Sequence, residues 1–183
     1  MAGWESLAWN VALLHAVQSS APLVGVGLAM LRLLCELPLA GCALLVAACG
    51  VVGRHRRLVV TAGIAAALCV ASERVTAALA AQPRPFAAGY SLPWVMHEAN
   101  NAFPSTHVAL AWAVTMAFLA ARRLRPAATC AVLTALMAWA RVATGLHWPL
   151  DIVGAVALAS VASAAAWRLV ARRPIPTRSE GIP

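Results

Sequence analysis

PLDIVGAVALASVASAAAWRLVA, residues 149–171, is a nearly uninterrupted apolar stretch with the length of a membrane span. A helix rises 1.5 Å per residue, so about 20 apolar residues cross a hydrocarbon core about 30 Å thick. Four further apolar segments approach this length, at 23–52, 58–81, 105–121 and 126–144. The pattern predicts an all-α, polytopic membrane helix bundle with about five transmembrane helices.

The segment at 23–52 is too long for one untilted crossing. Its Arg32 and Glu36 lie four residues apart, a spacing at which opposite charges pair on a helix. Pro38 removes a backbone hydrogen bond and predicts a kink. We therefore expect a tilted or bent helix with an Arg32–Glu36 ion pair near the interface.

The apolar residues of 3–18 also recur at helical spacing, but Glu5, Asn10 and His15 interrupt them. With no basic start before an apolar run, this stretch does not fit a cleavable signal peptide. The pattern predicts an amphipathic interfacial helix within residues 1–20. A sixth transmembrane span is the alternative.

Composition favours a single membrane-embedded domain over residues 1–183. The chain is 62% hydrophobic and 11% charged, whereas soluble domains are about a quarter charged. All 14 basic residues are Arg, against 6 acidic residues. They cluster between apolar runs, which argues against a nucleic-acid partner and favours contact with membrane lipids. The five Cys lie inside apolar runs and indicate neither a disulfide framework nor a zinc site.

Three Arg clusters, within 54–57, 122–125 and 172–178, set the expected orientation. With five spans they fall on one side, which the positive-inside rule makes cytoplasmic, with 172–183 as a cytoplasmic tail. The connections at 82–104 and 145–148 then lie on the external side. Most residues able to do chemistry are found there.

Within 141–151, a histidine and a carboxylate lie at the expected external mouth of the bundle. Pro149 and Asp151 suit the first turn of a helix, and Asp151 follows His147 by four residues. A carboxylate that holds one ring nitrogen leaves the other as a nucleophile or base. Taken alone, the pair also fits a structural hydrogen bond. Arg141 points toward the same mouth.

The stretch from Pro104 to His107 opens a helix with Ser105 as the expected N-cap. Free N–H groups at a helix N-terminus bind phosphate, and His107 adds a proton donor beside the anion. Arg84 and Arg141 supply charged forks that match phosphate oxygens. The chain has one Asp and no carboxylate cluster, so we expect neither a metal nor another cofactor.

Together these residues resemble the signature of the type 2 phosphatidic acid phosphatase superfamily, over about residues 72–155. That signature joins an Arg-Pro pair, a Pro-Ser-x-His block and an Arg-(five residues)-His-(three residues)-Asp block. With His97, Phe103 and the Gly-x-His-Trp-Pro-x-Asp run at 145–151, the chain is similar to the bacitracin-resistance type of undecaprenyl-diphosphate phosphatase.

The resemblance implies a role for each matching residue. His147 would attack the terminal phosphorus and form a phosphohistidine, with Asp151 orienting it. His107 would protonate the leaving oxygen and later activate water. The transferred phosphoryl group would be held by Arg84, Ser105, Thr106 and Arg141.

One position departs from the superfamily pattern. Ala77 stands where a Lys commonly precedes the Arg by seven residues. Arg74, ten residues before Arg84, is a candidate replacement at the pocket, and His97 is a second pocket candidate from the subfamily match.

The implied activity is metal-independent dephosphorylation of undecaprenyl diphosphate to undecaprenyl phosphate. The site would face the periplasm or exterior of a bacterial cell membrane, with consequences for cell-wall synthesis and bacitracin resistance. One alternative is another lipid phosphate, such as phosphatidylglycerophosphate or phosphatidic acid, or phosphoryl transfer to a second lipid. A remote alternative is a non-catalytic, anion-binding membrane protein.

Overall fold

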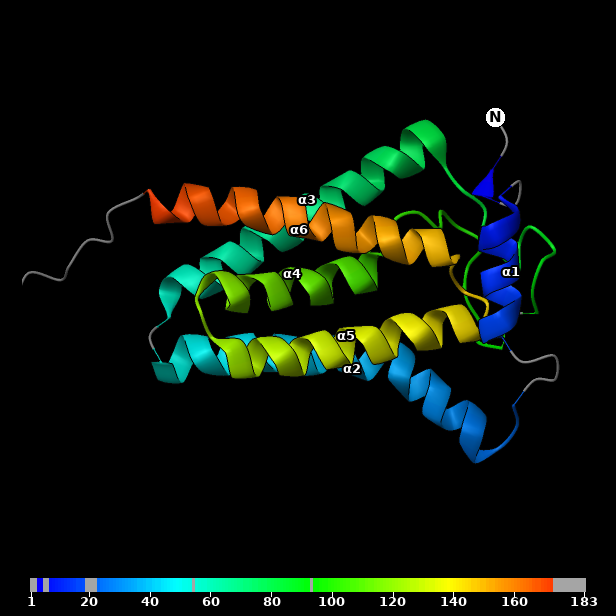
Figure 1. The fold of residues 1–183 in the computed structure, drawn as a ribbon, viewed down its shortest axis with the longest axis horizontal. Helices are drawn as coiled ribbons and strands as arrows, with labels where there is room; N and C mark the ends of the chain where they lie inside the picture. The colour runs from blue at the N-terminus through cyan, green and yellow to red at the C-terminus, as the bar shows by residue number, and fades with distance from the viewer. Residues whose placement is uncertain (1–2, 5–6, 19–22, 54, 93, 173–183) are drawn as a thin grey trace, which may run out of the picture.

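The computed structural model describes residues 3–4, 7–18, 23–53, 55–92 and 94–172. These ranges hold six helices, namely α1 (Ala8–Val17), α2 (Val26–Gly53), α3 (Arg56–Ala80), α4 (Thr106–Ala120), α5 (Leu124–Ala143) and α6 (Pro149–Ala171). Figure 1 shows α2 to α6 running lengthwise through the molecule and α1 lying across one end. The prediction of a helical membrane bundle is confirmed.

Helices α2, α3, α5 and α6 are, within the described residues, the four that are long and apolar enough to cross a membrane. The remaining expected span, α4, has 15 residues and rises about 22 Å. It packs against all four of the longer helices. Its buried side chains include Ala109, Ala113 and Ala117, and small residues let neighbouring helices approach closely. A short α4 enclosed by longer helices therefore forms the centre of the bundle.

Helix α2 contains Pro38 and bends in Figure 1, as expected from the sequence. The predicted Arg32–Glu36 pair is wrong. Glu36 bonds instead to His107 and Arg141, while Arg32 is exposed. The physical reason is that α2 packs on α5, which brings the buried guanidinium of Arg141 within reach of Glu36.

Helix α1 has 10 residues and rises about 15 Å, too short for a crossing. Its position across the end of the bundle fits the expected interfacial helix. One of its buried residues, Asn10, is polar, and its Oδ1 accepts a hydrogen bond from Leu150 N at 3.0 Å. That N–H belongs to the first turn of α6 and has no partner within its own helix. Helix α1 thus caps the helix that carries Asp151.

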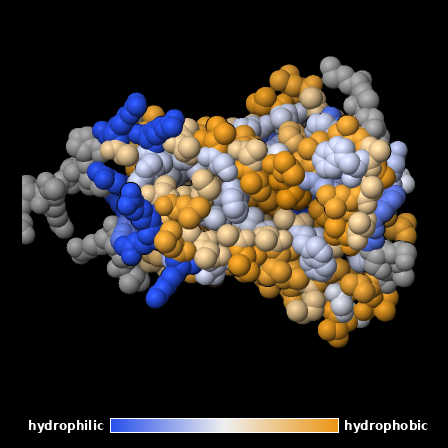
Figure 2. Space-filling model, viewed as in Figure 1, coloured by the Kyte–Doolittle hydropathy of each residue, from blue (hydrophilic) through white to orange (hydrophobic). Residues whose placement is uncertain are grey.

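The basic clusters gather at one end of the molecule. Figure 2 shows hydrophilic residues around this end, where α2 joins α3, α4 joins α5 and α6 finishes. The connections at 81–105 and 144–148 lie at the opposite end (Figure 1). Arg54, Arg173, Arg178 and most of the expected cytoplasmic tail, 173–183, fall outside the described residues.

Replacing Asn10 with Ala should lower the stability of the bundle. Leu150 N would lose its acceptor in a buried setting, and loss of a helix-capping side chain costs about 1 kcal/mol. Thermal unfolding in detergent measures the effect. Asn10→Asp keeps the oxygen acceptor and should lose less, whereas an Ala variant as stable as the wild type would contradict the capping role.

Candidate active site

The residues predicted to carry chemistry converge on one cavity of about 210 Å³ at the α1 end of the bundle. It is lined by Glu73, Arg84, His97, Asn100, Asn101, Pro104, Thr106, His107, Arg141 and His147. Ser105 and Asp151 are fully buried beside residues of this lining. Arg74 is exposed and does not line the cavity, and its neighbour Glu73 does.

His147 lies just before α6, and its hydrogen bonds define its tautomer. Nδ1 is 3.1 Å from the carbonyl of Ala102 and 3.3 Å from Asp151 Oδ2. Both partners are acceptors, so Nδ1 carries the hydrogen. Nε2 lies 3.1 Å from Arg84 Nη1, which can only donate. The lone pair of His147 is therefore on Nε2, on the side of the arginine.

The electrostatic setting keeps His147 neutral. Burial, together with the positive charges of Arg141 and Arg84, holds the pKa of His147 well below its usual 6.5. A neutral imidazole with its lone pair fixed in place is the nucleophilic form of the side chain.

Asp151 is held in the first turn of α6 by the backbone before it. Its Oδ2 accepts a hydrogen bond from Trp148 N at 2.8 Å, and Pro149 begins the helix. The indole Nε1 of Trp148 donates to Pro83 O at 2.9 Å. The predicted Pro149–Asp151 helix start is thus present, and Trp148 ties it to the segment that carries Arg84.

Arg84 is buried, with 5% of its surface exposed, and neutral acceptors surround it. Nε and Nη2 both donate to Asn100 Oδ1, at 3.0 and 2.8 Å, and Nη1 donates to Leu146 O at 2.9 Å. Burial, with the nearby charge of Arg141, lowers the pKa of Arg84 to about 10. It stays charged at neutral pH, and its partners leave that charge uncompensated.

Ser105 occupies the N-cap position of α4 as expected, but its side chain makes no capping bond. Its Oγ is buried without a hydrogen-bond partner among the described residues. Its backbone N donates to Asp151 O at 3.3 Å. A Cβ at Gly154 would lie 2.2 Å from the ring of Phe103, so glycine there lets Phe103 pack onto α6. These contacts fix the start of α4 against α6.

Arg141 projects from α5 and is 1% exposed. Its Nη1 donates to Cys35 O at 2.9 Å and to Glu36 Oε1 at 3.2 Å. Its Nε is buried and has no partner in the part of the chain described. Glu36 Oε2 in turn lies 2.9 Å from His107 Nε2. The cavity therefore combines two arginines, unpartnered donors and a helix N-terminus, which is the donor set of an anion site.

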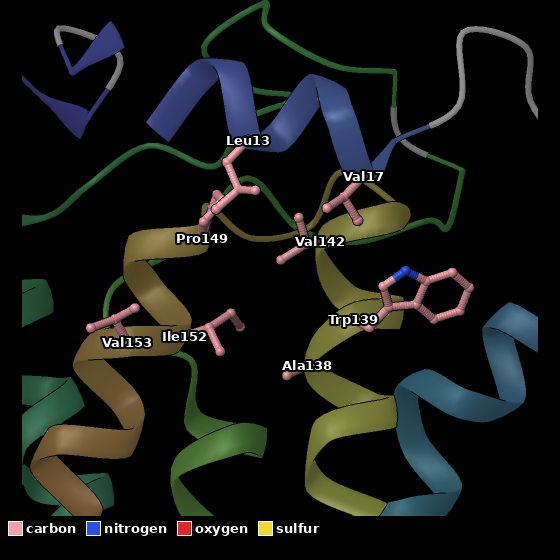
Figure 3. Close-up of a pocket in the computed structure, with 8 residues that line it drawn as sticks. All are labelled: Leu13, Val17, Ala138, Trp139, Val142, Pro149, Ile152 and Val153. Atoms are coloured by element: carbon pink, nitrogen blue, oxygen red, sulfur yellow. The ribbon is translucent and has the colours of Figure 1, made fainter. Parts of the chain in front are cut away.

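Two other hollows lie near this end. An open one of about 530 Å³ is lined by Met96, His97 and Glu98, and it shares His97 with the polar cavity. The other, of about 240 Å³, lies between α5 and α6 beneath α1 (Figure 3). Its lining is apolar throughout, from Leu13, Val17, Ala138, Trp139, Val142, Pro149, Ile152 and Val153. It contains no group able to do acid–base chemistry.

Sequence reasoning missed three polar residues that line the cavity, and a fourth, Glu36, that contacts two of its lining residues. Asn100 and Asn101 lie in the connection before α4, and an adjacent Asn pair has no periodicity that distinguishes it from a solvated loop. Glu73 and Glu36 lie in apolar helices, where an ionisable residue is a functional candidate. That rule was the available signal for both carboxylates. Within the described ranges, no group of three or more His, Cys, Asp or Glu is arranged to hold a metal ion.

The family model described as "PAP2 superfamily" matches residues 58–175. The chain belongs to the PAP2 superfamily. It is 34% identical over 100 residues to the Escherichia coli (strain K12) protein named "Putative undecaprenyl-diphosphatase YbjG". The match covers 55% of this chain and 50% of that protein, so the chain spans about half the length of the relative it matches.

The fold resembles that of a solved chain, described as "Crystal structure of Aquifex aeolicus LpxE", with a TM-score of 0.70. The alignment covers 91% of this chain and 99% of LpxE at 17% identity, which shows a shared fold.

The buried neutral His147 should make the protein less stable in acid. Its pKa is depressed in the folded state, so below pH 6.5 His147 binds a proton in the unfolded chain but not in the native state. Stability should fall as pH drops through this range. Thermal unfolding between pH 8 and pH 5 tests this, and His147→Asn should show a shallower pH dependence than the wild type. Equal slopes would contradict a neutral buried imidazole.

Proposed function

We propose that the chain is a membrane-bound lipid phosphatase that removes the terminal phosphate of a polyprenyl diphosphate, with undecaprenyl diphosphate as the favoured substrate. The observation that carries this proposal is the Nε2 lone pair of His147 beside Arg84 in a cationic cavity. A neutral nucleophile among permanent positive charges suits attack on a phosphate anion. The apolar bundle beneath it suits a substrate with a lipid tail.

In the first half of the reaction, His147 Nε2 attacks the terminal phosphorus and the bond from phosphorus to the leaving oxygen breaks. The leaving oxygen takes a proton from His107, and the phosphoryl group stays on Nε2. Asp151 stabilises the positive ring through Nδ1, which it contacts at 3.3 Å. Arg84 and Arg141 balance the phosphoryl charge.

In the second half, the neutral His107 accepts a proton from water, and the resulting hydroxide attacks phosphorus. The P–N bond breaks, inorganic phosphate leaves, and His147 recovers its lone pair. Phosphoryl oxygens would be bound by Ser105 Oγ and Arg141 Nε, two buried donors without a partner among the described residues, with backbone N–H groups near Thr106. In this scheme no metal takes part.

The bundle offers an apolar border to the cavity. Helices α2 and α3 diverge at the α1 end, and Figure 2 shows hydrophobic residues on both projecting ends. Leu37 follows Glu36 directly and is 57% exposed, and Val75 lies two residues after Glu73 and is 54% exposed. Such a border supports a substrate whose tail remains in the bilayer while its phosphates enter the cavity.

The preference for a diphosphate rests on two observations. The open hollow that shares His97 with the cavity offers room beside the reacting phosphate. The name of the Escherichia coli relative also specifies an undecaprenyl-diphosphatase.

Detergent-purified protein should release inorganic phosphate from undecaprenyl diphosphate in excess chelator. His147→Ala removes the nucleophile and should lower the rate at least about 10³-fold. His55→Ala, at the opposite end of the bundle, is the matched control and should keep the wild-type rate.

Other outcomes redirect the proposal. Activity on phosphatidic acid with none on the diphosphate would keep the chemistry and overturn the substrate. Silence on both lipids, with anion binding retained in His147→Ala, would favour the non-catalytic alternative.

We propose that the cavity faces the cell exterior or periplasm, because the Arg clusters at the other end favour the cytoplasm. Met96 on the cavity side is 94% exposed and Leu124 on the basic side is 69% exposed. In intact spheroplasts, a membrane-impermeant maleimide should label Met96→Cys and spare Leu124→Cys. Both should react after lysis, with the wild type reporting any background from its native Cys. The reverse pattern would overturn the orientation.

A further inference from the structure

Glu36 of α2 is the carboxylate that contacts the proposed proton donor. Its Oε2 lies 2.9 Å from His107 Nε2, and its Oε1 accepts a hydrogen bond from Arg141 Nη1 at 3.2 Å. Both partners line the cavity. Glu36 itself lies outside the residues matched by the family model, 58–175, so the family match assigns it no role.

The charges around His107 make this contact consequential. Arg84, His97 and His147 come from the connections, Arg141 from α5, and Glu73 from α3. The arginines disfavour a second positive charge on the imidazole. Glu73 Oε1 is engaged by Asn101 Nδ2 at 3.3 Å. Among the described carboxylates, Glu36 is the one that contacts His107, and an adjacent carboxylate favours the imidazolium.

We propose that Glu36 is a positioning residue that orients His107 and stabilises its protonated form, so that a proton can be delivered when the leaving oxygen departs. The inference rests on the acid role proposed for His107. As the P–O bond breaks, His107 gives its proton to the leaving oxygen, and the contact with Glu36 holds the ring in place. When His107 then takes a proton from water, the ion pair with Glu36 forms again.

A pair of substrates with different leaving groups separates this role from a structural one. An alkoxide needs a proton to depart, whereas p-nitrophenolate leaves readily without one. Glu36→Gln should lower kcat on phosphatidic acid about 10-fold to 100-fold, a part of the roughly 10²–10⁴ that a positioned acid contributes. On p-nitrophenyl phosphate the fall should stay below about 3-fold, because general-acid assistance contributes little there. KM should change little on either substrate.

The pH profile gives a second readout. Without the carboxylate, the basic limb of kcat on phosphatidic acid should move to lower pH, because His107 loses its proton more easily. Glu36→Asp keeps the charge and should restore most of the wild-type limb with an intermediate rate. Arg32→Gln, exposed four residues earlier on α2, is the matched control and should keep wild-type kinetics.

Equal losses on both substrates, an unmoved basic limb, or a gain in rate would overturn the role of Glu36. If Glu36→Gln does not yield folded protein, Glu36→Asp is measured instead. The same criteria then apply to the ratio of its kcat values on the two substrates. His107→Ala, measured alongside, separates the two proposals. If only His107→Ala loses activity selectively on phosphatidic acid, the positioning role of Glu36 is rejected. If neither variant shows a selective loss, the acid role of His107 is rejected.

Discussion

The hydrogen bonds of His147 Nδ1 are the constraint on which the site depends. Their acceptors, Ala102 O and Asp151 Oδ2, belong to the connection before α4 and to the first turn of α6. Occupying Nδ1 leaves the lone pair on Nε2, where Arg84 already lies. One imidazole thus joins the connection at 81–105 to the start of α6, and any shift between α4 and α6 changes the direction of its lone pair.

The bundle holds two buried arginines, Arg84 and Arg141, near each other. No carboxylate bonds directly to Arg84 among the described residues. Arg84 bonds to amide and carbonyl oxygens, which satisfy its donors but carry no full charge. Arg141 bonds to a backbone carbonyl and to Glu36, and Glu36 also contacts His107. Positive potential therefore remains on the side of His147, where it opposes protonation and attracts an anion. Of the carboxylates near the cavity, Glu36 is the one that contacts His107, whereas Asp151 contacts His147 through Nδ1.

The sequence predicted α6 residue for residue, because apolar length and helix-start chemistry are local properties. Most of the residues that the signature spacing named also line one cavity. Its failures are tertiary. Helical spacing pairs Glu36 with Arg32, but the packing of α2 on α5 offers the buried Arg141. Asn100 was missed because only the folded connection brings it to Arg84. Arg74 was expected at the pocket, but it lies on another face of α3. The adjacent Glu73 lines the cavity instead.

Helix α1 shows why the pocket needs support from outside the motif. Trp4, just before it, packs edge-on against Phe103 with ring centroids 5.3 Å apart. Asn10 holds Leu150 at the start of α6. The first contact supports the segment that leads into α4, and the second supports the start of α6, the helix that carries Asp151. Both sides of His147 are therefore held by the N-terminal region that includes α1. A change in the position of α1 would therefore act on Phe103 and on the start of α6 together.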